Sequence, residues 1–183
     1  MQLKIEFNNF WSRKYLVFHD KKAFAEINRF GLIRQGITAK KDNQVWTYIE
    51  KGFINTSIIA FDGIHEKQIG EFPIKNIIQL SSILGKRQIS PGIFYTPNAN
   101  YKLAINFQNK NIYSWLDQNN ETLITYDMTT RIKSLITSIS FNRKTTCVAQ
   151  IPDNYSDIDL TLFFLGIFII DLNLSLESIG HTP

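Results

Sequence analysis

The stretch SDIDLTLFFLGIFIID, residues 156–171, is apolar at most positions and has Asp residues near both ends. Its central run, 160–170, contains one Thr and one Gly among large aliphatic and aromatic side chains. A helix that spans a bilayer needs about 20 apolar residues, and this run is roughly half that length. Asp159 and Asp171 would fall inside any longer window. We therefore expect no transmembrane span, and the run is either a buried strand or a buried helix.

The residues before the run favour a helix. Ser156 and Asp159 have a spacing that resembles a capping box, in which two side chains bond free backbone N–H groups of the first turn. Asp157 and Asp159 would lie in that turn, where the helix dipole favours negative charge. These signals predict a helix over about 154–171. Because its apolar side chains point in all directions, this helix must be buried on all sides.

Short segments with alternating apolar and polar residues recur along the rest of the chain, and many are rich in β-branched and aromatic residues, as strands are. They are LKIEF, KYLVF, AFAEI, VWTYI, SIIAF, KQIGEF, YKLAINF, NIYSWL, TLITYD, LITSISF and TCVAQI. Turn signals separate them, such as Asp-Gly at 62–63 and Pro-Gly at 91–92. The segment 74–84 fits either a short helix or an irregular strand.

Many short, evenly spaced strands are typical of a sandwich or a barrel. A helix that needs cover on all sides favours a barrel, since the helix fills an interior too wide for strand side chains alone. Closure also removes the exposed edges of the sheet. We predict a mainly β fold, a closed antiparallel β-barrel around a buried apolar C-terminal helix, as one domain over residues 1–183.

These segments resemble the tubby C-terminal-like superfamily, which includes the plant LURP-one-related proteins and the phospholipid scramblases. The apolar helix that ends in IIDL is similar to the closing helix of that group. The hairpins AFDGIHEKQIGEF and YSWLDQNNETLITY are similar to its repeated motif of an aromatic residue and Asp, a turn and an apolar strand. The resemblance covers roughly 14–171, and it implies a closed barrel around a buried helix.

The chain also departs from that superfamily. Its helix is rich in Phe and Ile, where the superfamily favours small and aliphatic residues. The sequence has no clean match to the basic phosphoinositide pocket of the tubby proteins or to the calcium-binding segment of the scramblases. We therefore carry neither activity over to this chain.

Composition narrows the class of protein further. With 44% hydrophobic and 20% charged residues the chain is typical of a globular protein. Its one cysteine, Cys147, excludes an internal disulfide framework and fits a reducing compartment. The first residues, MQLKIEFNNFWSRK, lack the apolar core of a signal peptide, so we expect a cytoplasmic protein. The net charge of +4 favours an anionic partner.

Few residues offer catalytic or metal-binding chemistry. His19, His65 and His181 lie far apart in the sequence and lack metal-ligand spacing. Cys147 alternates with its neighbours as a strand residue does, which is typical of a small buried thiol. The Asp residues between 153 and 159 lack the spacing of a calcium loop, and helix capping explains them better. We predict no catalytic residue, no metal site and no cofactor.

Basic residues occur in five adjacent pairs, and two of these pairs have a loop-like setting between predicted strands. These pairs, Lys40–Lys41 and Lys86–Arg87, are our candidates for contact with anionic lipid. The alternative is that charges at hairpin ends keep the protein soluble and protect strand edges.

Two functions of different classes remain. The first is a noncatalytic binding or scaffold domain that contacts an anionic membrane surface or a protein partner, with no nucleic acid expected. The second is a small-molecule-binding barrel, or an enzyme, with a site at one mouth of the barrel. A helix that fills the interior should leave no ligand cavity of about 300 Å³ or more inside. The presence or absence of such a cavity inside the barrel therefore separates the two functions.

Overall fold

The computed structural model describes residues 1–7, 14–31, 35–52, 56–64, 67–74, 91–106, 112–128 and 145–179. These residues form twelve strands and one helix. The strands are β1 (Gln2–Phe7), β2 (Lys14–His19), β3 (Lys22–Phe30), β4 (Gly36–Lys41), β5 (Gln44–Lys51), β6 (Thr56–Asp62), β7 (Lys67–Ile74), β8 (Gly92–Tyr95), β9 (Asn100–Ile105), β10 (Ile112–Leu116), β11 (Thr122–Asp127) and β12 (Thr145–Gln150). The helix α1 (Asp157–Ile179) follows β12.

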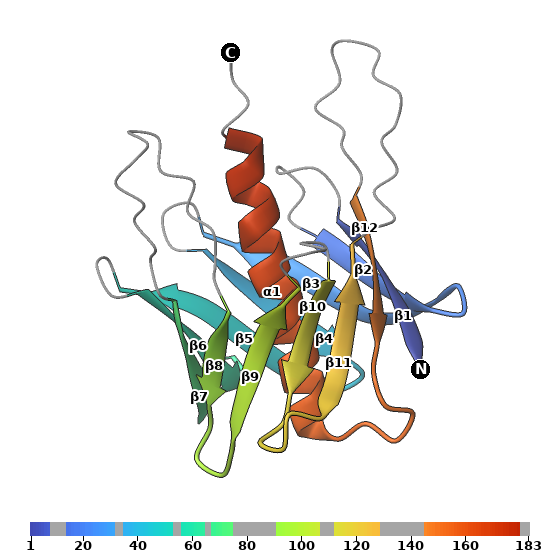
Figure 1. Cartoon of the computed structure of the whole chain (residues 1–183). Helices are drawn as coiled ribbons and strands as arrows, with labels where there is room; N and C mark the ends of the chain where they lie inside the picture. Colours follow the sequence, from blue (N-terminus) through green and yellow to red (C-terminus); the bar gives the residue numbers. More distant parts are fainter. Residues whose placement is uncertain are drawn as a thin grey trace.

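The twelve strands form a closed antiparallel barrel (Figure 1). Each strand pairs with the next one along the chain, and β1 closes the barrel by pairing with β12. Across this closing seam Gln2 lies opposite Gln150 and Phe7 lies opposite Thr145. The predicted mainly β barrel with one C-terminal helix is therefore confirmed.

Each strand turns alternate side chains into the barrel, as the period of two requires. In β1 the side chains of Leu3, Ile5 and Phe7 are buried, whereas Gln2 and Lys4 between them are exposed. The same alternation around the barrel encloses an interior of aliphatic and aromatic side chains.

The helix α1 runs through this interior (Figure 1). Every residue from 160 to 173 is buried, so no face of that part of the helix meets solvent. Rings from the barrel wall pack directly against it: the centroids of Trp46 and Phe164 are 5.1 Å apart, and Tyr126 stacks on Phe163. The prediction that the apolar helix is buried on all sides is confirmed.

The helix differs from its predicted bounds at both ends. It begins at Asp157 instead of 154, because Ser156 caps it: the Ser156 backbone N–H and side chain both donate to an Asp159 carboxylate oxygen, at 2.8 and 2.7 Å. It continues to Ile179 instead of ending at Asp171. The Asp171 carboxylate does not end the helix, because it accepts a hydrogen bond from the Tyr15 hydroxyl at 2.9 Å inside the barrel.

The observed strands do not correspond one to one with the predicted segments. Two observed strands, β4 and β8, are not among the predicted segments. The predicted strand LITSISF, at 135–141, lies outside the described residues. Of the ambiguous segment 74–84, only Ile74 is described, and it is the last residue of β7.

Buried tyrosines of the wall bond to the helix backbone. The Tyr48 hydroxyl donates to the Thr161 carbonyl at 2.8 Å, and the Tyr126 hydroxyl donates to the Phe163 carbonyl at 2.8 Å. The Tyr126 ring can reach this carbonyl because Gly166 has no side chain: a Cβ at that position would lie 2.3 Å from the Tyr126 hydroxyl oxygen. The only glycine in the buried run is thus where a wall ring meets the helix backbone.

Replacing Gly166 by Ala should destabilise the protein by roughly 1–3 kcal/mol, the usual range for overpacking a core. This is opposite in sign to the gain of about 1 kcal/mol that Gly→Ala brings to an exposed helix. In a Tyr126→Phe background the same substitution should cost less, because the ring then lacks the hydroxyl and can shift. Urea unfolding of the wild type, Gly166→Ala, Tyr126→Phe and the double variant measures the coupling free energy between the two substitutions. An equal cost in both backgrounds would show that the contact is not the reason for the glycine.

The two ends of the barrel are distinct. The strand ends that flank 20–21, 42–43, 63–66, 96–99 and 117–121 lie at the end of the barrel where α1 begins, as does the connection 151–156. We name it the helix-start end. There Gln44 donates to the Asp157 carboxylate at 3.2 Å. At the opposite end, the helix-exit end, Tyr15 contacts Asp171. In a barrel where consecutive strands alternate in direction, every connection belongs to one end or the other.

Candidate functional site

Charge is segregated between the two ends. Six connections join strand ends that lie at the helix-exit end: 8–13, 31–35, 52–55, 75–91, 106–111 and 128–144. In sequence these connections contain ten basic residues and no Asp or Glu. The basic residues are Arg13, Arg34, Lys75, Lys86, Arg87, Lys110, Arg131, Lys133, Arg143 and Lys144. Half of the 20 Lys and Arg residues of the chain therefore belong to the connections of this one end.

The connections of the helix-start end have the opposite composition. They contain six acidic residues and one basic residue, Lys21; the acidic residues are Asp20, Asp42, Glu66, Asp117, Glu121 and Asp153. Two of these are held in ion pairs: Asp42 with Lys41 at 2.6 Å, and Asp153 with the N-terminal amine at 2.6 Å. The net charge of +4 is therefore small although the connections of one end are basic and those of the other end are acidic.

The four residues predicted to bind lipid are not brought to one surface by the described part of the chain. Lys40 and Lys41 are the last two residues of β4, at the helix-start end, so their predicted loop setting is wrong. Lys86 and Arg87 lie outside the described residues. The described strand ends that flank their segment, Ile74 and Gly92, belong to the helix-exit end.

The two lysines of β4 have different surroundings. Lys40 is exposed on the outer wall, opposite Glu26 of β3. The Lys41 side chain is only 15% exposed, and its ammonium lies 5.3 Å from the ring centroid of Phe24 and 5.7 Å from that of Tyr155. The hydrogen bond to Asp42 raises the pKa of Lys41, and burial opposes this shift. Lys41 therefore holds the β4–β5 turn against the segment before α1.

A polar cluster lies inside the barrel at the helix-exit end. Asp171 of α1 accepts the hydrogen bond from Tyr15, and its other carboxylate oxygen is 3.6 Å from Nε of Arg29. Arg29 also donates to the Gln35 side-chain oxygen at 2.6 Å. Burial raises the pKa of Asp171, while the charge of Arg29 and the Tyr15 hydroxyl lower it. These contacts join the helix to β2, β3 and the start of β4, which is a structural role.

The sequence interpretation did not find this cluster. Asp171 was interpreted as the end of the helix, and Arg29 lies two residues beyond the predicted strand segment AFAEI, at 23–27. The signal that could have found it is a buried helix that contains a carboxylate, because a buried charge requires a partner from the surrounding wall.

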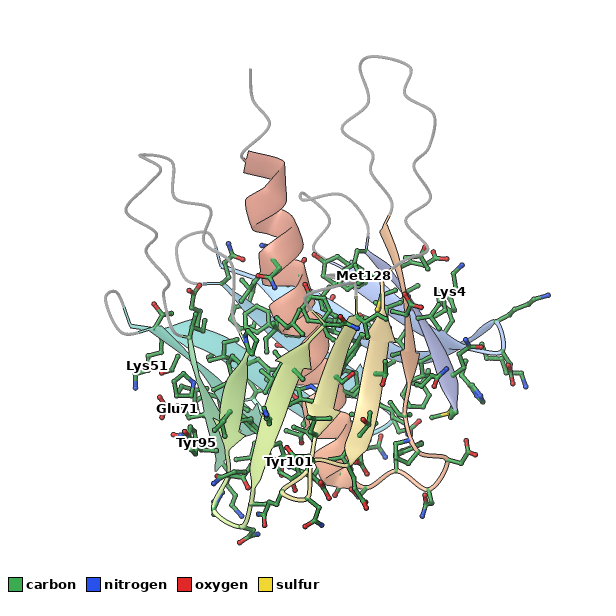
Figure 2. All side chains as sticks on the ribbon, viewed as in Figure 1. Lys4, Lys51, Glu71, Tyr95, Tyr101 and Met128 are labelled. Carbon is green, nitrogen blue, oxygen red and sulfur yellow. The ribbon has the colours of Figure 1, made fainter. Side chains whose placement is uncertain are left out.

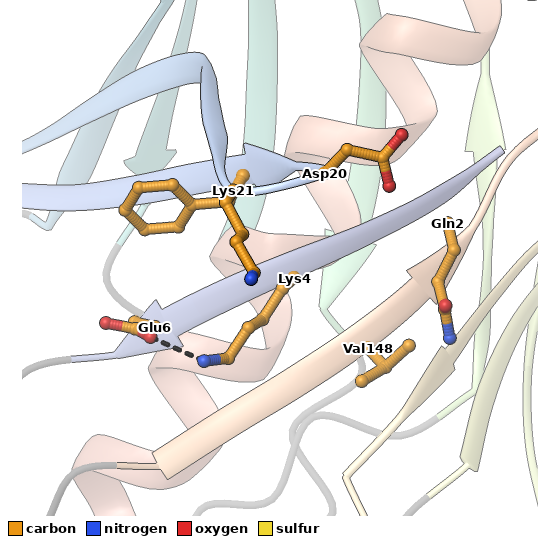
Figure 3. Close-up of a pocket in the computed structure, with 7 residues that line it drawn as sticks. Gln2, Lys4, Glu6, Asp20, Lys21 and Val148 are labelled. Atoms are coloured by element: carbon orange, nitrogen blue, oxygen red, sulfur yellow. Dashed lines mark hydrogen bonds and ion pairs between the residues drawn. The ribbon is translucent and has the colours of Figure 1, made fainter.

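Two hollows lie outside the apolar interior. One, of about 420 Å³, is on the outer wall, where the β2–β3 turn stands over β1 (Figure 3). Lys4 within it is paired with Glu6 at 2.7 Å, and Asp20 and Lys21 approach from the turn. The other hollow, of about 380 Å³, lies at the helix-start end beside the first turns of α1. We name it the mouth hollow.

The residues considered for catalysis have ordinary surroundings. His19 Nε2 lies 3.6 Å from the Asp20 carboxylate in an exposed turn, whereas His65 and His181 lie outside the described residues. Burial raises the pKa of the Cys147 thiol to about 12, so the thiolate that a nucleophile requires is scarcely formed at neutral pH. Within the described ranges, no group of three His, Cys, Asp or Glu residues is placed to hold a metal ion.

No protein family, curated protein or solved structure matches the chain. Of the residues that the structure describes, none form a helix with both the length and the apolar character that crossing a bilayer requires.

Proposed function

We propose that this chain is a noncatalytic binding domain of the tubby-like kind, which contacts anionic membrane surfaces in the cytoplasm through its helix-exit end. The observation that carries the proposal is the charge of the connections at that end, ten basic residues and no acidic one. Each Lys or Arg near an anionic leaflet contributes about 1 kcal/mol of attraction. A single pair is too weak, whereas several tethered to one end can act together.

The opposite end supports the same orientation. Its connections are acidic, so an anionic surface repels that end while it attracts the other. The electrostatic field of the whole molecule then orients the domain as it approaches. The cytoplasmic leaflet, which is rich in anionic lipid, is the surface that this polarity suits.

The proposal predicts co-sedimentation with phosphatidylcholine vesicles that contain phosphatidylserine, and none with phosphatidylcholine alone. Binding should fade as salt rises from about 0.1 M to about 1 M, because the Debye length falls from about 10 Å to about 3 Å. Reversing two charges at the helix-exit end, with Lys86→Glu and Arg87→Glu, should weaken binding strongly. The melting temperature should stay close to that of the wild type, and a large decrease would show that the loss of binding reflects unfolding.

A matched control is available at the other end. Lys21 and Lys22 are exposed beside the β2–β3 turn, and reversing both makes the same change in net charge at the helix-start end. This control should bind nearly as well as the wild type. Lys40→Glu tests the separate prediction that Lys40, on the outer wall of the barrel, contacts anionic lipid. If the wild type stays in the supernatant at low salt, the membrane proposal is wrong; if both double variants lose binding equally, net charge and not the helix-exit end is responsible.

A further inference from the structure

The mouth hollow has the size and position of a small-molecule site. Its volume of about 380 Å³ lies within the range of ligand sites, roughly 300–1,000 Å³, and the mouths of β-barrels are a common place for them. It is formed by the start of β5, the β6–β7 hairpin, the β8–β9 turn and the first turns of α1. It lies at the opposite end from the basic connections, so what it binds is independent of membrane contact.

The apolar part of the hollow combines two aromatic rings with the aliphatic side chains of Ile69, Pro97 and Ile158. Trp46 and Tyr101 line it together with Ile158 of the helix. Trp46 is only 3% exposed, and its ring is held against Phe164 with the centroids 5.1 Å apart. Tyr101 lies near the end of the barrel where the helix begins (Figure 2). Packing in the interior thus holds the Trp46 ring in place at the base of the hollow.

The charges that line the hollow are mainly negative. Asp62 and Asp157 contribute two carboxylates, and Lys67 is the one cation among the described residues that line it. Asp62 is exposed and lies opposite Lys67 in the register of β6 and β7, but the two form no ion pair within the described part of the chain. Burial raises the pKa of Tyr101, and the carboxylates of Asp159 and Asp117 raise it further, which places two more negative charges near this phenol.

We propose that the mouth hollow binds a small organic cation, a molecule with an ammonium group on a short apolar body. Carboxylates and the faces of aromatic rings are the groups that attract an ammonium. Asp62 would meet the charge, while Trp46 and Ile158 would meet the apolar body. A carboxylate ligand of the same shape would be repelled by the same residues, so the sign of the ligand's charge is the distinguishing feature.

The test uses the full chain and three probes of the same length: n-hexylammonium, n-hexanol and n-hexanoate. Titrations followed by 1H–15N correlation spectra report on the Trp46 indole N–H and on the backbone N–H of Tyr101. We expect saturable shifts with n-hexylammonium, much weaker binding of n-hexanol and none of n-hexanoate. Asp62→Asn should weaken n-hexylammonium binding by roughly two- to fivefold, the effect of one solvent-exposed ion pair.

Asp20→Asn is the matched control, because it removes an exposed carboxylate of the same end that does not line this hollow. Its affinity for n-hexylammonium should equal that of the wild type. Equal binding of n-hexanoate, an unchanged affinity in Asp62→Asn, or the absence of shifts at Trp46 and Tyr101 would each overturn the proposal. The comparison of the three probes on the wild type needs no variant, so it holds even if Asp62→Asn folds poorly.

Discussion

Replacing Phe164 by Asp is expected to abolish the folded protein. Phe164 is fully buried in α1, where its ring packs between those of Trp46 and Phe163. Removing a buried Phe ring costs about 3–5 kcal/mol, and a buried carboxylate without a partner costs several kcal/mol more. The sum is comparable to the whole stability of a domain, roughly 5–15 kcal/mol. Thermal unfolding followed by circular dichroism should show no cooperative transition, and Ile167→Asp should behave in the same way.

The control for this experiment is Ile64→Asp. Ile64 is 69% exposed in the β6–β7 turn, so the same type of change there meets water instead of the core. Its melting temperature should stay close to that of the wild type, since surface substitutions change stability by about 0.5 kcal/mol or less. A Phe164→Asp protein that melts like the wild type would contradict the burial of the helix.

The helix and the barrel class could be predicted because they follow from local physical rules. An apolar run with no polar face must be surrounded, and Ser156 with Asp159 marks where the helix begins. These features lie within a few residues of each other in the sequence. The position of Asp171 could not be interpreted in the same way, because its partners Tyr15 and Arg29 come from the other end of the chain.

The strands β4 and β8 could not be predicted, because each begins with a glycine that packs against an aromatic ring of the neighbouring strand. In β4, a Cβ at Gly36 would lie 2.5 Å from the Phe30 ring of β3. In β8, a Cβ at Gly92 would lie 2.7 Å from the Phe72 ring of β7. A glycine at the start of a short segment indicates a turn when taken alone. Here each glycine leaves room for an aromatic ring that only the folded sheet supplies.

The charge difference between the two ends of the barrel could not be predicted either, because it depends on knowing where β4 and β8 are. Consecutive antiparallel strands alternate in direction, so each connection is assigned to an end by counting the strands before it. If one strand is missed, every later connection is assigned to the wrong end. Without β4 and β8 the connections cannot be assigned to ends. The pairs Lys40–Lys41 and Lys86–Arg87 then appear equivalent, although the structure places the first in a strand near the helix-start end. The composition of the connections was visible in the sequence, but their arrangement was not.

The central claim is that α1 is the core on which the barrel is built, and a shortened chain tests it most directly. The strands bury their inner faces in a single core, and the side chains of α1 form the centre of that core. A chain of residues 1–151 should therefore show no cooperative thermal transition. A chain of residues 1–179 is the matched control, because it keeps the whole described helix, and it should unfold like the full chain. A cooperative transition of residues 1–151 near the melting temperature of the full chain would contradict the account.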